Sequence, residues 1–171
     1  MIELFLGGAR SGKSNLAEQC ASDSGLEVVY IATGTAGDAQ MKTRIEQHQQ
    51  SRPSQWLLVE EPINLAQVII DNMSTQRCLL VDCLTLWLSN CMFSVDDCYQ
   101  TQRQQLLDVL EKVPGKIIFV ANETSMGVIP MGEITREFCD RAGLLHQALA
   151  QKSNKVTLSV AGLPLVLKDH K

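Results

Sequence analysis

Short apolar runs alternate along the chain with stretches in which apolar residues recur every three or four positions. Most of the runs are continuously apolar, a pattern typical of strands that are covered on both faces of a sheet. They predict strands over residues 2–6, 28–32, 56–59, 78–81, 116–121 and 156–160, with a last strand over 163–167. Because Pro164 cannot donate to a strand ladder, we expect the last two strands to form a hairpin at the edge of the sheet.

The stretches between these runs have the helical period of apolar positions. They predict helices over residues 13–22, 38–50, 63–73, 84–93, 97–112 and 132–151. The alternation predicts an α/β fold, in which a mostly parallel sheet carries helices on both faces. No repeat, low-complexity tract or long linker divides the chain, so we expect residues 1–171 to form a single domain.

Composition and charge favour an ordinary globular protein and argue against a nucleic-acid-binding or membrane protein. Hydrophobic residues make up 45% of the chain and charged residues 20%, as in an ordinary globular protein. The net charge of -4 argues against nucleic acid as a partner, because binding its backbone needs clustered Lys and Arg. Without a basic leader or a long apolar segment, the sequence indicates a cytoplasmic protein with no membrane span. The six cysteines show no CxxC pair and no zinc spacing, which favours reduced thiols.

The first candidate binding site lies between the first predicted strand and the first predicted helix. The eight residues there match G-x-x-x-x-G-K-[ST] and are Gly7, Gly8, Ala9, Arg10, Ser11, Gly12, Lys13 and Ser14. Glycines allow backbone N–H groups to curl round phosphate oxygens, and the helix N-terminus adds the positive end of its dipole. Lys13 is expected to reach the β and γ phosphates of ATP or GTP, and the Ser14 hydroxyl to bind Mg²⁺. A chance glycine-rich turn is the alternative, which the strand-loop-helix context disfavours.

An apolar strand that ends in an acid is the second part expected of such a site. Residues 78–82, Cys-Leu-Leu-Val-Asp, fit this pattern. We therefore predict that Asp82 helps to hold Mg²⁺ beside the triphosphate. The alternative is that Asp82 only caps the following helix, a frequent role of Asp after a strand.

One of the three histidines, His48, stands out by its spacing. Arg44 lies one helical turn before it and Arg52 about one turn after it, near the point where Pro53 should end the helix. Cationic neighbours lower the pKa of a histidine and keep the imidazole neutral, which is the state that attacks phosphorus. Arginines also hold phosphate oxygens. The spacing alone leaves open a surface histidine on a polar helix.

Further motifs accompany these residues between Leu4 and Lys168. They are Tyr30-Ile-Ala-Thr33, Asp38-x-x-Met41, Arg44-Ile-x-x-His48-x-x-x-Arg52-Pro53-x-x-Trp56-x-x-x-Glu60, Asp82-Cys-Leu-Thr-Leu-Trp-Leu-x-Asn90, and Asn122-Glu123 followed by Gly127-x-x-Pro130. In this combination the chain resembles the bifunctional adenosylcobinamide kinase / adenosylcobinamide-phosphate guanylyltransferase family of cobalamin biosynthesis.

The resemblance implies two reactions. A kinase step would move the γ-phosphoryl group of ATP or GTP to the hydroxyl of adenosylcobinamide, and a transferase step would attach GMP to that phosphate and release pyrophosphate. It implies that His48 becomes guanylylated, and that Thr33, Glu60 and Asp82 lie near the guanine nucleotide. It also implies a RecA-like phosphate-loop NTPase fold and a homotrimer. The rival functions are a small-metabolite kinase without nucleotidyl transfer and a nucleotide-binding switch or assembly ATPase.

Three residues depart from the pattern of that family. Ser125 stands where the family usually has Gly, Cys139 where it has Arg, and His146 where it has Asn. We expect these departures to affect the corrinoid pocket or a subunit contact and to leave the nucleotide chemistry unchanged.

The sequence leaves open the roles of two residues, Glu123 and His146. Glu123 either orients or deprotonates the substrate hydroxyl or is an ion-pair partner, and His146 fits a packed or capping histidine.

Overall fold

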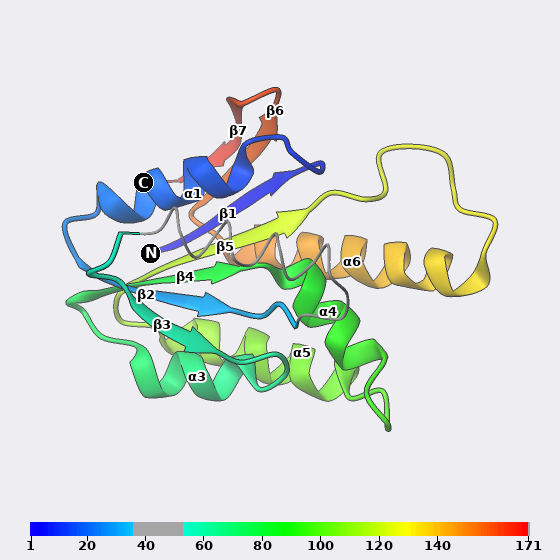
Figure 1. The fold of residues 1–171 in the computed structure, drawn as a ribbon, viewed down its shortest axis with the longest axis horizontal. Coiled ribbons are helices and arrows are strands. Elements are labelled where there is room, and N and C mark those ends of the chain that lie inside the picture. Colours follow the sequence, from blue (N-terminus) through cyan, green and yellow to red (C-terminus); the bar gives the residue numbers. More distant parts are fainter. Residues whose placement is uncertain (36–52, 171) are drawn as a thin grey trace.

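The computed structural model describes residues 1–35 and 53–170, whose strands form one seven-stranded sheet. The strands are β1 (Ile2–Gly7), β2 (Glu27–Ala32), β3 (Leu57–Glu60), β4 (Arg77–Asp82), β5 (Lys116–Asn122), β6 (Lys155–Val160) and β7 (Leu163–Asp169). Their order across the sheet is β3-β2-β4-β5-β1-β6-β7. Neighbouring strands run parallel except β7, which runs antiparallel to β6 at the edge (Figure 1). Every predicted strand is present, and the last two form the expected edge hairpin.

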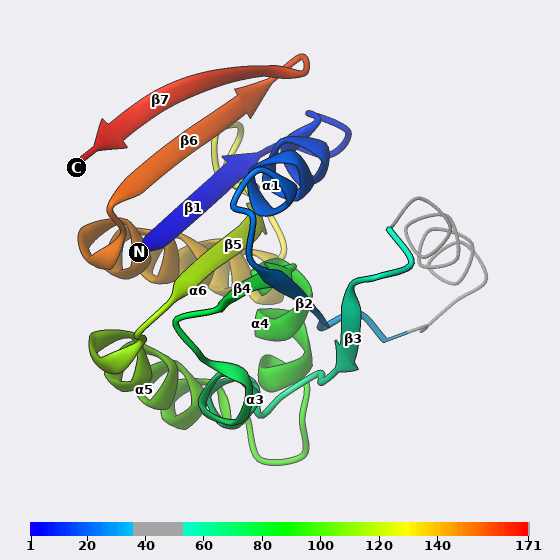
Figure 2. The same cartoon turned by 90° about the vertical axis from the view of Figure 1, so that its left-hand side faces the viewer.

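Helices cover both faces of this sheet. They are α1 (Lys13–Ser22), α3 (Leu65–Asn72), α4 (Leu84–Met92), α5 (Tyr99–Val109) and α6 (Glu133–Lys152). The α1 helix packs on one face, and α3 to α6 pack on the other (Figure 2). The predicted α/β fold with helices on both faces is therefore confirmed. The predicted helix over residues 38–50, with Arg44 and His48, lies outside the described residues, as does Arg52.

Alternate residues of the central strands supply two apolar layers. In β1, Leu4 and Leu6 belong to the larger layer under α3 to α6, and Phe5 belongs to the smaller layer under α1. The small, fully buried side chains of Ala17 and Ala21 allow α1 to lie close to the sheet. Burial on both faces explains why these strands appear in the sequence as continuous apolar runs.

Two helices begin later than their apolar patterns predicted. The α3 helix begins at Leu65, because the Glu61 carboxylate accepts the N–H groups of residues 63 and 64 at 2.8 Å and forms a turn ahead of the helix. The α5 helix begins at Tyr99, since Asp97 has a φ of 39°, outside the helical region. Its last turn continues as a 3-10 helix over Leu110–Lys112. Local hydrogen bonds and backbone angles set where these helices begin, and the spacing of apolar residues in the sequence does not predict them.

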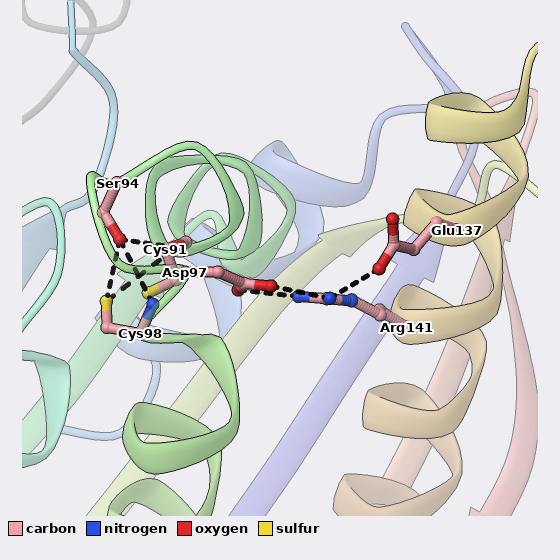
Figure 3. Close-up of polar contacts among 6 residues, drawn as sticks. All are labelled: Cys91, Ser94, Asp97, Cys98, Glu137 and Arg141. Atoms are coloured by element: carbon pink, nitrogen blue, oxygen red, sulfur yellow. Dashed lines mark hydrogen bonds and ion pairs between the residues drawn. The ribbon is translucent and has the colours of Figure 1, made fainter.

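An ion-pair cluster ties the connection between α4 and α5 to α6 (Figure 3). Arg141 donates to both carboxylate oxygens of Asp97 at 2.7 Å, and to the carboxylate of Glu137 one helical turn earlier. The Arg141 guanidinium also lies over the ring of Tyr99, 5.4 Å from its centroid. The cluster fixes the start of α5 against α6 and is structural.

The remaining expectations about the chain concern membranes and thiols. Among the described residues, no helix is both long and apolar enough to cross a membrane.

The six cysteines are all free thiols, in agreement with the sequence. Burial raises the pKa of Cys78 and of Cys83 to about 11, so these thiols stay protonated and pack as small hydrophobic groups.

Candidate active site

The phosphate loop joins the carboxyl end of β1 to the first turn of α1 (Figure 1). Arg10 has a φ of 58° and Gly12 a φ of 90°, so the chain turns through left-handed conformations, which glycine adopts without strain. Lys13 is only 8% exposed, and its ammonium donates to the carbonyl oxygen of Gly8 at 3.2 Å. The lysine therefore curls back over the loop, where the motif predicts phosphate oxygens.

The hairpin of β6 and β7 is hydrogen-bonded to the backbone of this loop. Ser159 at the end of β6 donates its hydroxyl to the carbonyl oxygen of Ser11 at 2.6 Å, and the Gly162 N–H donates to the same oxygen at 2.8 Å. A Cβ on Gly7 would lie 2.4 Å from the Ser11 hydroxyl oxygen and 2.7 Å from the Ser159 carbonyl oxygen. The loop therefore packs tightly against the end of β6, a contact that the sequence motif does not predict.

The parallel register brings other predicted nucleotide residues to the same edge of the sheet. Ala32, the last residue of β2, pairs with Glu60 of β3 on one side and with Asp82 of β4 on the other. Thr33 follows directly and is buried, and its hydroxyl oxygen donates to the Cys83 carbonyl at 2.6 Å and accepts the Cys83 N–H at 3.0 Å. Thr33, exposed Glu60 and half-buried Asp82 therefore converge at the carboxyl edge.

The oxygen groups at this edge suit Mg²⁺. The Asp82 carboxylate accepts a hydrogen bond from the Tyr30 hydroxyl at 3.2 Å, and Ser14 lies in the first turn of α1. The described residues contain no group of three or more His, Cys, Asp or Glu that could hold a metal by itself. Because Mg²⁺ is usually bound by one or two carboxylates together with phosphate oxygens, this donor set fits a metal that arrives with a nucleotide.

A groove of about 500 Å³ lies beside the phosphate loop. It is lined by residues 8–11 of the loop, by the segment that follows β5, and by the end of β6. Glu123 lies in that second wall, and its N–H donates to the Gly7 carbonyl at 3.0 Å. Ser125 donates to Oε1 of Glu123 from its N–H at 2.7 Å and from its hydroxyl. Nδ1 of His146 lies 3.7 Å from Oε2 of Glu123.

Burial is the largest influence on both members of this pair. It lowers the pKa of His146 in spite of the neighbouring carboxylate, so the imidazole is neutral at physiological pH. Burial raises the pKa of Glu123 as well, but the hydrogen bonds that its carboxylate accepts from Ser125 outweigh this effect and leave the pKa below its ordinary value. Glu123 is consequently an ionised carboxylate beside the phosphate loop.

Sequence reasoning missed several residues of this region. Ser159 and Gly162 carried no motif, and Tyr30 was noted only as part of the family pattern. The Tyr30 ring stacks against Trp56 with centroids 6.4 Å apart. The phosphate loop, Thr33, Glu60 and Asp82 all lie at the carboxyl edge of one sheet, with β5 between β4 and β1. Arg44, His48 and Arg52 fall outside the described residues.

Comparison with known proteins identifies relatives over nearly the whole chain. Residues 3–167 match the family model described as cobinamide kinase / cobinamide phosphate guanyltransferase. The bifunctional adenosylcobalamin biosynthesis protein CobP of Pseudomonas aeruginosa is 52% identical over 171 residues, which cover 99% of each of the two chains. The bifunctional adenosylcobalamin biosynthesis protein CobU of Escherichia coli is 34% identical over 182 residues, covering 98% of this chain and 100% of the relative.

Solved structures of low sequence identity share the fold. A Pyrococcus horikoshii protein has a TM-score of 0.61 at 8% identity, covering 99% of this chain and 87% of its own. The RadB recombinase has a TM-score of 0.52 at 16% identity, with 92% and 73% covered. The P4 protein of bacteriophage φ6, in complex with ADP, has a TM-score of 0.51 at 13% identity, with 96% and 53% covered. These likenesses concern the fold alone, and they agree with the predicted fold class of a mostly parallel sheet with helices on both faces.

Proposed function

The chain belongs to the cobinamide kinase / cobinamide phosphate guanyltransferase family, and on that premise we propose that its phosphate loop serves both reactions. The enzyme is a bifunctional transferase of cobalamin biosynthesis, as its full-length relatives are named. The observation that carries the proposal is the position of Lys13, curled over the loop onto Gly8 at the edge where Thr33, Glu60 and Asp82 converge.

In the kinase step, the hydroxyl of adenosylcobinamide attacks the γ-phosphorus of ATP or GTP, and the nucleoside diphosphate leaves. Backbone N–H groups of the loop and the Lys13 ammonium bind the phosphate oxygens. Ser14 and Asp82 would hold Mg²⁺, which offsets charge on the phosphate oxygens when it is bound. Such transfer needs positioning and charge and no protein nucleophile.

In the transferase step, His48 is the nucleophile. Its neutral imidazole nitrogen attacks the α-phosphorus of GTP, and pyrophosphate leaves. The phosphate of adenosylcobinamide phosphate then attacks the same phosphorus, the bond to His48 breaks, and adenosylcobinamide-GDP forms. Arg44 and Arg52 hold phosphate oxygens in both displacements. The family resemblance of the Arg-Ile-x-x-His segment supports these roles.

We extend the proposal to the surroundings of the enzyme. Thr33, Glu60 and Asp82 bind the guanine nucleotide, a reading supported by their position at one edge of the sheet. Residues 1–171 act as one catalytic domain in the cytoplasm and assemble as a homotrimer. The apolar, exposed edge strand β7, with Leu163 71% exposed and Leu167 56% exposed, supports assembly with another copy, because such edges are rarely left uncovered.

The test of the proposal is incubation with GTP labelled at the α-phosphorus, in the presence of Mg²⁺. A phosphorus–nitrogen bond to imidazole survives alkali and is cleaved by acid, so label should stay on the denatured protein at high pH and leave at low pH. His48→Asn should remove the label and keep phosphorylation of adenosylcobinamide. The matched control is His170→Asn, which changes an exposed histidine beyond β7 and should label normally.

The outcomes separate this function from its rivals. Full labelling of His48→Asn would assign the adduct to another side chain. Phosphorylation without any labelling of the wild type would support a small-metabolite kinase. Nucleotide binding without a phosphorylated product would support a switch or an assembly ATPase.

A further inference from the structure

Glu123 lines the groove beside the phosphate loop, next to the loop residues that the proposed kinase step uses. Gly8 forms part of the groove wall and also accepts the hydrogen bond from the Lys13 ammonium, the group that meets the β and γ phosphates. Glu123 lines the same groove, and its backbone is bonded to Gly7, the residue before Gly8. The side chain of Glu123 is only 12% exposed, so it packs against its neighbours in the groove wall and does not extend into solvent.

Neighbouring residues make the two oxygens of this carboxylate unequal. Oε1 accepts both hydrogen bonds from Ser125. Oε2 faces Nδ1 of His146 at 3.7 Å, which is longer than a hydrogen bond. Nδ1 is itself buried and has no hydrogen-bond partner among the described residues. Oε1 is therefore held in place, whereas Oε2 keeps its capacity to accept a proton.

We propose that Glu123 is the general base of the kinase step, which rests on the function proposed above. As the substrate hydroxyl oxygen forms its bond to the γ-phosphorus, the bond from that phosphorus to the β–γ bridging oxygen breaks, and its electron pair leaves with the nucleoside diphosphate. The hydroxyl proton passes to Oε2 of Glu123. The substrate class is an alcohol whose hydroxyl enters the groove between the phosphate loop and the segment after β5.

The protonation state of the pair agrees with this role. Because the pKa of Glu123 lies below its ordinary value, the carboxylate is ionised and can accept a proton at neutral pH. His146 is neutral, since burial lowers its pKa, so it does not neutralise the carboxylate as a permanent cation would. A carboxylate is the acceptor that protein kinases use for the same proton.

The three departures from the family pattern all contact the segment that begins with Glu123. Ser125 binds its carboxylate, His146 faces the other carboxylate oxygen, and Cys139 Sγ lies 3.9 Å from the carbonyl oxygen of Thr124. These three residues thus lie in or against this short segment, two of them against the Glu123 carboxylate itself.

The test measures phosphorylation of adenosylcobinamide with γ-labelled ATP in Glu123→Gln. Glutamine keeps the shape and the acceptor oxygen for Ser125 but cannot take a proton, so kcat should fall about 100-fold or more with KM changed little. Covalent labelling with GMP should persist, because that step does not use the base. Glu133→Gln, at an exposed carboxylate at the start of α6, is the matched control and should keep the wild-type kcat.

A second pair of variants separates proton transfer from folding. Glu123→Asp retains a carboxylate and should recover part of the lost rate. Glu123→Ala should be partly rescued by added formate, which supplies a small base to the groove. A kcat of Glu123→Gln within about threefold of wild type, or Glu123→Asp as slow as Glu123→Gln without formate rescue of Glu123→Ala, overturns the inference. A wild type that phosphorylates nothing instead contradicts the proposed function.

Discussion

Tyr30 donates its hydroxyl hydrogen to Oδ2 of Asp82 at 3.2 Å, from a residue that is only 4% exposed. The two residues lie on the adjacent parallel strands β2 and β4, where Tyr30 pairs with Leu80, two positions before Asp82. The hydroxyl engages one carboxylate oxygen and leaves Oδ1 for other ligands. Tyr30 therefore orients the acid that we expect to hold Mg²⁺ with the nucleotide.

Tyr30→Phe should weaken the use of Mg²⁺ without disturbing the fold. Phenylalanine fills the same space and keeps the stacking with Trp56 but loses the hydrogen bond, so half-maximal activity should require about 10-fold more Mg²⁺. Magnesium titration of the phosphorylation rate measures this effect. Asp82→Asn should have a larger effect, because it removes a negative charge from the metal ligands. An unchanged titration for both variants would show that Asp82 does not hold the metal; a helix-cap role is already excluded, since the N-cap of α4 is Cys83 and no side chain caps this helix.

Lys13→Ala should abolish phosphoryl transfer and leave the protein folded. The ammonium contacts the Gly8 carbonyl and belongs to neither apolar layer, so its loss should cost little stability. Its charge, in contrast, meets the transferring phosphates. The measurements are the phosphorylation rate and the midpoint of thermal unfolding. A folded variant with a near-normal rate would remove this loop from catalysis.

Gly7→Ala should damage both stability and nucleotide binding. The new Cβ would lie 2.7 Å from the Ser159 carbonyl oxygen, and backbone atoms cannot move aside as the tip of a flexible side chain can. Overpacking of this kind costs about 1–3 kcal/mol. Gly8→Ala is the matched control for stability, because a Cβ at Gly8 meets no atom of the protein within 4 Å. Urea unfolding and equilibrium nucleotide binding test the pair, and equal stabilities would contradict the close packing seen at Gly7.

Arg141→Met should lower stability by about 1 kcal/mol, through loss of the bonds to Asp97 and of the contact with Tyr99. Hydrogen bonds from Arg141 hold the pKa of Asp97 below its ordinary value. The stabilisation is therefore present above the unfolded pKa of about 4 and is lost as the pH falls through the lower folded value.

The two proteins should accordingly differ in unfolding free energy at pH 7 and converge at strongly acidic pH. Arg77→Met, which removes an ion pair with the exposed Glu27, should have a smaller effect at every pH. A difference for Arg141→Met that stays constant down to low pH would show that Asp97 is not its electrostatic partner.

The parts of the site that the sequence predicted depend on neighbouring residues. The phosphate loop follows from eight consecutive residues, and Asp82 follows from a single apolar run, so a local pattern is sufficient for both. The fold class follows for a similar reason, because continuous apolar strands that alternate with helical stretches allow little other than a covered parallel sheet.

The parts that the sequence did not predict depend on residues far apart. Ser159 meets Ser11 across 148 positions, and Tyr30 meets Asp82 across 52. Glu123 and His146 come together only because α6 packs back on the sheet, with Leu145 and Leu149 buried in the larger apolar layer. Such contacts arise from packing, which residue spacing along the chain does not encode.

The support that Ser159 and Gly162 give to the Ser11 carbonyl also bears on how the protein is made. During synthesis the phosphate-loop motif is made first, and the two groups that hold its backbone follow about 150 residues later. A nascent chain that has reached α6 contains the full motif without its supporting hydrogen bonds. Competence to bind nucleotide should therefore be acquired only after residues 155–169 have been made, when β6 of the hairpin pairs with β1.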